Sequence, residues 1–435
     1  MEPEPNGAPE GAVERSWAPL SYRVYFLGLL VVSYMINFTD RQLLSILLEP
    51  IKRDLALADW QLGVLGGVAF ALFYVTLGVP VAKLSDRFSR VNILAGAMAL
   101  WSLATAACGL ATNFLQLLLI RIGVAVGESA GTPPSYSMIS DLFDPRRRAT
   151  AIGIYVAGPP LGTALGLAIG GWLSQGIGWR TTFVVVGLPG LLLALLMKLT
   201  LREPPRGHTE ARADPTVAPS ALAVARLLAS RPSFLCLAIG SGVAAFAGYA
   251  MNLWLPSFLI RSHGLSTAQA GGWLAMIQIG AGIGGGVLGG FVADRFAVRD
   301  KRWLALVPAV AMSVAAPAGY VAFTARSPAL ALMGTAVTLL GYYSWAGGVY
   351  TAVQAMVGLR MRAVAVAMLL FIINLIGMGF GPPIIGAVSD LLRATAGDQS
   401  LRLSLLIAAP MFLVSAVLYV AGALNLRADI ARAPA

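Results

Sequence analysis

The chain contains twelve apolar runs that are each long enough to cross a lipid bilayer, and this pattern limits its fold more than any other feature. A spanning helix needs about 20 mostly apolar residues. Of the 435 residues, 57% are hydrophobic and only 12% are charged, whereas soluble domains carry about 25% charged residues. We therefore predict an all-α membrane protein. The twelve predicted transmembrane helices cover residues 22–48, 60–82, 91–111, 114–139, 149–173, 181–200, 233–259, 267–292, 303–323, 329–356, 364–390 and 403–425.

A polar stretch near the middle of the chain divides the predicted helices into two sets of six. Residues 201–232 contain several prolines and charges, which is typical of a linker, and a short surface helix is predicted around 221–229. We predict two pseudo-symmetric six-helix bundles, at 22–200 and 233–426, joined by this linker. Residues 1–21 and 427–435 are the predicted N-terminal and C-terminal tails.

The positions of lysine and arginine predict how the chain lies in the membrane. Most of the 31 basic residues fall in the tails, the linker and the loops on the same side. Such a bias marks the cytoplasmic side, so we expect both tails and the linker in the cytoplasm. It also accounts for the net charge of +11 without nucleic acid as a partner. Arginine greatly outnumbers lysine, which favours GC-rich coding and hence a bacterial inner membrane. The opposite loops hold Lys52, Arg53, Arg180, Arg261, Arg326, Arg393 and Arg402.

Two short motifs recur about half a chain apart. The sequence Asp-Arg-Phe occurs at 86–88 and again at 294–296, after the second and eighth predicted helices. A Gly-Pro-Pro motif occurs at 158–160 and again at 381–383, in the fifth and eleventh. Both repeats relate a helix to the one six places later, which indicates two halves of similar orientation. Parallel halves with a binding site between them are a known plan for secondary transporters.

Several of these motifs resemble those of the major facilitator superfamily of transporters. Residues 82–90 look like the signature after helix 2, although Ala82 and Ser89 stand where glycines are common. Residues 121–127 resemble the helix 4 signature, and residues 158–162 resemble the helix 5 motif. The resemblance covers the whole chain. It implies the twelve-helix fold of that superfamily, alternating access between two halves, and a central cavity lined by helices 1, 4, 7 and 10.

Three further segments resemble the Spinster branch of this superfamily, and in particular a bacterial member. They are residues 37–41 in helix 1, residues 127–133 in helix 4 and residues 137–143 at the end of helix 4. The resemblance implies an amphipathic lipid as cargo, such as a lysophospholipid or a sphingoid lipid, moved with or without coupling to protons.

Two acidic and two basic side chains are predicted inside the membrane at similar depth. Asp40 and Arg41 lie in helix 1, while Arg121 and Glu128 share one face of helix 4. A charge at the bilayer centre costs about 2.5–3.5 kcal/mol, so such residues usually serve a function. We predict that Asp40 and Glu128 couple transport to protons, and that Arg41, Asn37 and Arg121 bind substrate. The alternative for Arg121 is a structural link between helices 1 and 4.

The second half of the chain offers aromatic and amide side chains in place of charges. Such a wall opposite the charged one would suit an amphiphile, with Arg41 for an anionic headgroup. The alternative is that these side chains face lipid or pack between helices. The predicted substrate-binding residues are Tyr249, Asn252 and Trp254 in helix 7 and Tyr343, Trp345 and Tyr350 in helix 10.

Charged residues near the predicted cytoplasmic ends of the helices suggest a gate. Ion pairs between them would close the cytoplasmic side and break again, because an exposed pair contributes only about 0–1 kcal/mol. A carboxylate also favours a helix start, so Asp86 is placed to cap helix 11. The predicted gate residues are Asp86, Arg87, Arg90, Asp141, Arg146, Asp294 and Arg295.

These features together predict a secondary active transporter that moves an amphipathic lipid by alternating access, acting as a monomer. One alternative is a proton-driven multidrug exporter of the same superfamily. Another is a membrane-embedded lipid-modifying enzyme, which would need a catalytic group near the headgroup plane. The sequence shows no phosphate-binding loop, metal-ligand pattern or nucleophile–base arrangement. We therefore expect neither catalysis nor a cofactor or metal.

Overall fold

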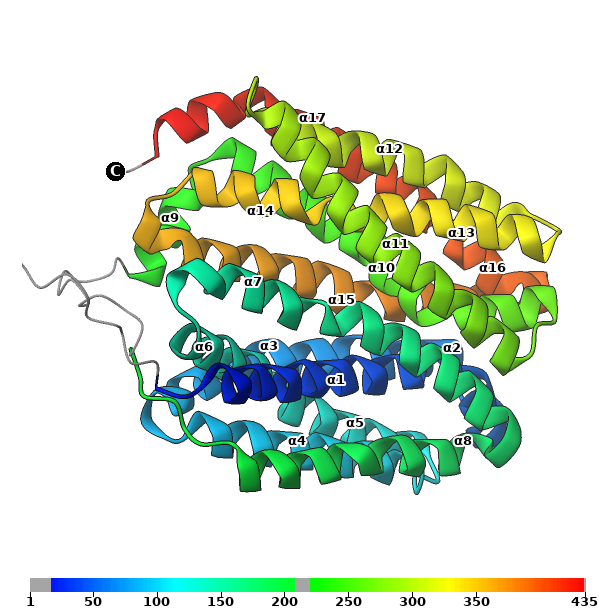
Figure 1. Ribbon diagram of the computed structural model, residues 1–435. Coiled ribbons are helices and arrows are strands. Elements are labelled where there is room, and N and C mark those ends of the chain that lie inside the picture. Colours follow the sequence, from blue (N-terminus) through cyan, green and yellow to red (C-terminus); the bar gives the residue numbers. More distant parts are fainter. Residues whose placement is uncertain (1–16, 208–219, 434–435) are drawn as a thin grey trace, which may run out of the picture.

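The computed structural model describes residues 17–207 and 220–433, and this part of the chain is helical without any strand (Figure 1). The side chains of eleven residues within it are not described, among them those of Lys83 and Asp86. The helices are α1 (Leu20–Leu55), α2 (Asp59–Gly66), α3 (Val68–Arg87), α4 (Arg90–Cys108), α5 (Phe114–Ser129), α6 (Thr132–Leu142), α7 (Pro145–Val156), α8 (Gly158–Thr200), α9 (Ala221–Ala229), α10 (Pro232–His263), α11 (Thr267–Ala297), α12 (Trp303–Thr324), α13 (Pro328–Tyr343), α14 (Ala346–Ala355), α15 (Arg362–Ala396), α16 (Ser400–Leu405) and α17 (Ala408–Ala431).

The described residues contain nine helical segments that are long and apolar enough to cross a membrane. Two of them, of 55 and 70 residues, are each long enough for two crossings. The first breaks at Gly178, whose φ of 77° lies in the left-handed region that favours glycine. The second breaks at the short 3₁₀ turn over Gly397–Gln399. With α2 and α3 counted as one further span, the fold matches the twelve predicted transmembrane helices.

The helices form two bundles that lie side by side, with α1 to α8 in one and α10 to α17 in the other (Figure 1). The bundles pack mainly through contacts of α8 with α11, of α15 with α2 and α3, and of α1 with α10. The linker lies at the same end of the molecule as both described chain ends (Figure 1). We call this the linker end. The predicted surface helix is present as α9, whose Val224 and Leu228 are buried.

The Gly-Pro motif of the fifth predicted helix forms a tight contact with the first. The helix is interrupted between Val156 and Gly158, where α7 gives way to α8. A Cβ atom on Gly162 would lie only 2.1 Å from the Met35 carbonyl oxygen of α1. No larger residue fits there without moving a backbone. The motif therefore packs α8 closely against α1.

Candidate functional site

A cavity of about 220 Å³ lies between the two halves. The first half contributes mainly α1, with one residue each from α2, α5 and α8. The second half contributes α10, α13 and α15. The lining residues are Phe38, Arg41, Gln42, Leu44, Gly66, Arg121, Thr163, Tyr249, Asn252, Leu253, Tyr342, Tyr343, Met378 and Pro382.

The first-half wall of the cavity carries an ion pair between α1 and α5. The Nε–H group of Arg41 donates to Glu128 Oε2 at 2.6 Å. The Glu128 side chain is fully buried, whereas Arg41 keeps 17% of its side-chain surface exposed. The Arg41 guanidinium also lies over the Phe38 ring, 4.9 Å from its centre. Asn37 and Arg121 are close enough to act on the same carboxyl group. The predicted charged cluster therefore forms, and its members Arg41 and Arg121 line the cavity.

Asp40 lies behind this wall and is fully buried. Its Oδ2 atom accepts a hydrogen bond from the Thr105 hydroxyl of α4 at 3.1 Å. Its Oδ1 atom has no hydrogen-bond partner among the described residues. The charges that act on it come from Glu128 and Arg121. A buried carboxyl group with one unused oxygen is chemically suited to hold a proton, because a neutral acid costs far less to bury than a carboxylate.

The second-half wall is a hydrogen-bonded set of aromatic and amide side chains. The Tyr343 hydroxyl donates to Gln278 Oε1 at 2.8 Å, and the Gln278 amide donates to Asn252. The Tyr249 hydroxyl donates to Asn374 Oδ1 at 3.1 Å. None of these side chains is charged. The cavity thus has the charged wall and the aromatic wall that the sequence predicts.

The structure places the other predicted substrate-binding residues away from the lining. Trp254 is fully buried, and its indole N–H donates to the Pro382 carbonyl at 3.0 Å. Trp345 is buried and packs against Tyr350, with ring centres 5.7 Å apart. Asn37 is buried beside Glu128. The order of residues along a helix does not reveal which side chains point between neighbouring helices. The prediction therefore included aromatic residues that do not line the cavity.

A second cavity, of about 170 Å³, lies between α3 and α15. The two cavities share α15, since Met378 lines the first and Gly379 the second, but most residues that line the second are exposed on the outer surface of the helices. Apart from the Thr76 side chain its lining is apolar. The lining residues are Val68, Ala71, Leu72, Thr76, Phe371, Leu375, Gly379 and Phe380.

At the linker end, two of the predicted gate residues pair within the first half. Arg90, at the start of α4, donates to Asp141 and, at 2.7 Å, to Glu203 of the linker. Asp141 in turn accepts from the Gly207 N–H at 2.9 Å. Burial works against the charge of Glu203, but its hydrogen bonds with Arg90, the Val91 N–H and Ser89, together with the charge of Arg90, outweigh this and hold its pKa below the usual range. These contacts fix the start of the linker to the first half.

The remaining predicted gate residues form no ion pair among the residues that the structure describes. Arg87, Arg146, Asp294 and Arg295 are all exposed. The Asp86 side chain, predicted to cap helix 11, lies outside the described part. In the described residues the gate therefore does not bridge the halves at this end, because Arg90 and Asp141 are engaged by each other and by the linker.

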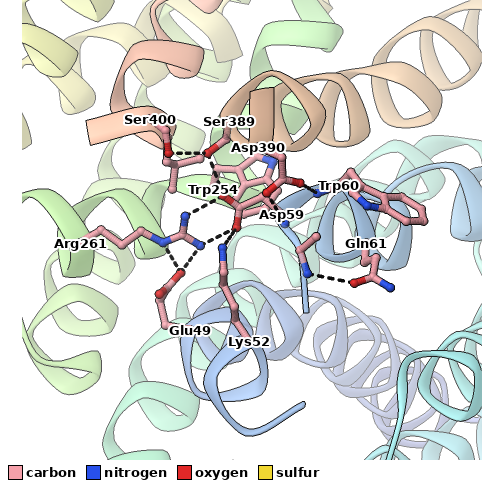
Figure 2. A network of polar contacts seen from close by, with 12 residues as sticks. Glu49, Lys52, Asp59, Trp60, Gln61, Trp254, Arg261, Ser389, Asp390 and Ser400 are labelled. Carbon is pink, nitrogen blue, oxygen red and sulfur yellow. Dashed lines mark hydrogen bonds and ion pairs between the residues drawn. The ribbon is translucent and has the colours of Figure 1, made fainter. Parts of the chain in front are cut away.

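Sequence reasoning missed a set of polar residues at the opposite end, which joins the two halves (Figure 2). Arg261 was assigned to a loop, yet its side chain is only 12% exposed. Its partners Glu49 and Asp59 are more deeply buried still. One feature of the sequence could have indicated this network, because acidic and basic residues of both halves lie at the same predicted membrane face. We call the side of the molecule that holds this network the Asp59 end.

Two membrane-embedded helical halves with a cavity between them are the plan of a secondary transporter. The chain belongs to the major facilitator superfamily, whose sequence pattern matches residues 30–382. This family and fold are those of transporters and not of enzymes.

Particular relatives are similar along nearly the whole chain. An MFS-type efflux pump of Mycolicibacterium smegmatis is 33% identical over 96% of this chain and 94% of its own length. Protein spinster homolog 1 of Homo sapiens is 28% identical over 92% of this chain and 80% of its length. The crystal structure of a bacterial homologue of the human lysosomal transporter Spinster, in an inward-facing and unoccupied conformation, is 32% identical with a TM-score of 0.87. It covers 95% of this chain and 99% of that chain. The predicted Spinster resemblance is confirmed.

Proposed function

We propose that this protein is a proton-coupled transporter of an amphipathic lipid with an anionic headgroup, such as a lysophospholipid or a phosphorylated sphingoid lipid. The observation that carries the proposal is the cavity with the Arg41–Glu128 pair on one wall and Tyr249, Asn252 and Tyr343 on the other. A guanidinium binds phosphate well, because its fixed N–H groups match the phosphate oxygens.

The size of the cavity favours a headgroup rather than a whole lipid. At about 220 Å³ it lies below the roughly 300–1,000 Å³ of sites that enclose a drug-sized ligand. The acyl chain would lie in the apolar groove between α3 and α15, whose lining is largely exposed toward the bilayer. A cavity with charged and amide groups and an apolar groove on the same helix α15 fit the two ends of an amphipathic molecule.

Proton coupling follows from competition for Arg41. In the structure its guanidinium is held by Glu128. A proton on Glu128 would remove the negative charge and release Arg41 for an anionic headgroup. Asp40, buried behind the pair and near Glu128, provides a second proton site. Proton and anionic substrate would therefore bind together rather than in exchange.

In this proposal the linker end faces the cytoplasm of a bacterial inner membrane, as the distribution of basic residues predicts. The protein acts as a monomer. The ion pairs that join the halves at the Asp59 end, together with the similarity to an inward-facing homologue, support a conformation closed on the outer side.

A test is the flux of a fluorescent lysophospholipid into proteoliposomes, with and without a pH gradient. We expect gradient-dependent flux in the wild type, abolished by Asp40→Asn and unchanged by Asp300→Asn at the surface. Equal flux in wild type and Asp40→Asn would mean that Asp40 has a structural role and that the protein moves the lipid without coupling to protons. Absence of flux in the wild type would contradict the lipid cargo.

The second candidate is a proton-driven drug exporter, which the similarity to the M. smegmatis efflux pump favours. It would use the same cavity with a cationic or neutral amphiphile. Export of dyes from whole cells, lost in Glu128→Gln, together with absence of lysophospholipid flux, would favour this candidate.

A further inference from the structure

At the Asp59 end, an arginine of the second half binds two acids of the first half. The two terminal N–H groups of Arg261, on α10, each donate to one oxygen of Asp59 at 2.8 Å. Its Nε–H donates to Glu49 of α1 at 2.7 Å. Lys52, one turn after Glu49, also donates to Asp59. The Asp59 side chain keeps 1% of its surface exposed, so this is a buried contact between halves (Figure 2).

A carboxylate of the second half caps a helix of the first half at the same place. Asp390, on α15, accepts hydrogen bonds from the backbone N–H groups of Asp59 at 3.0 Å and Trp60 at 2.7 Å. These are the first two residues of α2, and the residue before them, Ala58, has no side-chain acceptor. The first N–H groups of a helix have no partner within it and favour a negative charge. The start of α2 is therefore completed by the other half of the protein.

The backbones of the two halves approach closely at this point. A Cβ atom on Gly386 would lie 2.4 Å from the Asp59 carbonyl oxygen. Because Asp390 follows Gly386 by one helical turn, this approach brings its carboxylate to the start of α2. Ser389 adds a hydrogen bond to Asp59 Oδ2 at 2.7 Å. Separation of α15 from α2 would break the cap and the serine contact in one movement, and withdrawal of α10 would break the Arg261 pairs.

Ion pairs suit a contact that must open repeatedly. Burying charges costs about as much as their mutual attraction returns, so the net preference for the closed form is small. In the open form every one of these groups gains water. An apolar contact of the same area would instead favour closure strongly. Among the described residues, ion pairs between the halves occur at the Asp59 end, while Arg90 and Asp141 at the linker end pair within the first half.

We propose that Arg261, Asp59 and Asp390 form a latch that closes the Asp59 end of the central cavity and opens when the linker end closes. This inference rests on the alternating-access part of the proposed function and not on its cargo or its protons. Loss of the latch would move the population toward the form that is open at the Asp59 end.

The test measures distances between the halves by pulsed electron spin resonance, in protein whose Cys108 and Cys236 are replaced by alanine. One pair of spin labels, at positions Leu110 and Asp398, reports on the Asp59 end. A second pair, at Arg147 and Arg299, reports on the linker end. All four labelled residues are exposed.

The variants are Arg261→Gln and Asp390→Asn. The matched control is Arg180→Gln, which removes an ion pair to Asp54 within the first half, between α8 and α1. We expect Arg261→Gln to lower the ratio of closed to open molecules at the Asp59 end by at least about tenfold, since it leaves Asp59 and Glu49 buried without this counter-charge. Asp390→Asn should lower the same ratio by about two- to fivefold, because it removes the negative charge at the start of α2. Distances at the linker end should shorten at the same time. Arg180→Gln should change neither distance.

Unchanged distance distributions in both latch variants would overturn the proposal and leave the network as static packing. So would an increase at both ends together, which local loosening of the fold would cause. Asp390→Asn keeps the shape and the arginine pairs, so it tests the cap even where Arg261→Gln folds poorly. Failure of lipid flux with the expected shift in distances would remove the proposed cargo and leave the latch in place.

Discussion

The guanidinium of Arg41 and the carboxylate of Glu128 meet at 2.6 Å across α1 and α5, and only the arginine reaches the cavity with part of its surface. The Glu128 carboxylate is therefore buried behind the Arg41 guanidinium. Any group that competes for Arg41 must displace Glu128, and any proton that neutralises Glu128 weakens its hold on Arg41. In the proposed mechanism this contact therefore couples binding of the headgroup at Arg41 to binding of the proton at Glu128.

Glu128→Gln should uncouple substrate binding from the proton gradient. The amide keeps the shape of the side chain but carries no charge, so Arg41 is released at every pH. We expect lysophospholipid binding to persist and the dependence of flux on a pH gradient to disappear. Binding by isothermal calorimetry and flux in proteoliposomes check this. Gradient-dependent flux in Glu128→Gln would assign the coupling proton elsewhere.

Arg41→Ala should weaken binding of an anionic lysolipid by roughly tenfold to hundredfold, because a hydrogen bond to a charged group contributes about 1.5–3 kcal/mol. A neutral amphiphile of the same chain length should lose much less. The comparison of the two ligands in one calorimetric series is the measurement. An equal loss for both ligands would show that Arg41 supports the fold and does not bind the headgroup.

Gly162→Ala should destabilise the first half. The added methyl group would lie 2.1 Å from the Met35 carbonyl oxygen, and overpacking of this kind costs about 1–3 kcal/mol. We expect a lower thermal unfolding temperature in detergent. Gly153→Ala is the control, since a Cβ atom there has nothing within 4 Å. Equal unfolding temperatures for the two variants would contradict the tight contact between α1 and α8.

The attachment of the linker start should depend on pH. Burial opposes the charge of Glu203, but its hydrogen bonds with Arg90, the Val91 N–H and Ser89 and the charge of Arg90 together lower its pKa in the folded protein. The stabilisation is therefore present above the usual range of a glutamate and is lost as the pH falls through the lowered pKa. Hydrogen exchange of residues 201–207 should speed up on acidification, relative to an unattached peptide. Glu203→Gln should show fast exchange without this pH dependence. Constant protection in the wild type down to strongly acidic pH would exclude a role for Glu203.

Helical periodicity was enough to predict the charged cluster, but it did not predict which other residues line the cavity. Steps of three and four residues place Arg121 and Glu128 on one face of a helix, and the predicted depths bring them level with Arg41. The same reasoning predicts Trp254 in the cavity, but in the structure its ring packs at the Asp59 end beside Gly386. Which side of an apolar helix faces a neighbouring helix depends on the neighbour, and in a membrane protein both sides are apolar.

The sequence by itself determined the twelve spans, the two halves and the burial of Asp40 and Glu128, because the bilayer imposes length and polarity on each helix separately. Tertiary structure alone decided the pairing of Arg41 with Glu128, the residues that line the cavity and the contacts between Arg261, Asp59 and Asp390. Those contacts join helices far apart in the chain. Their existence depends on how the two halves are placed against each other, and a transporter has more than one such placement.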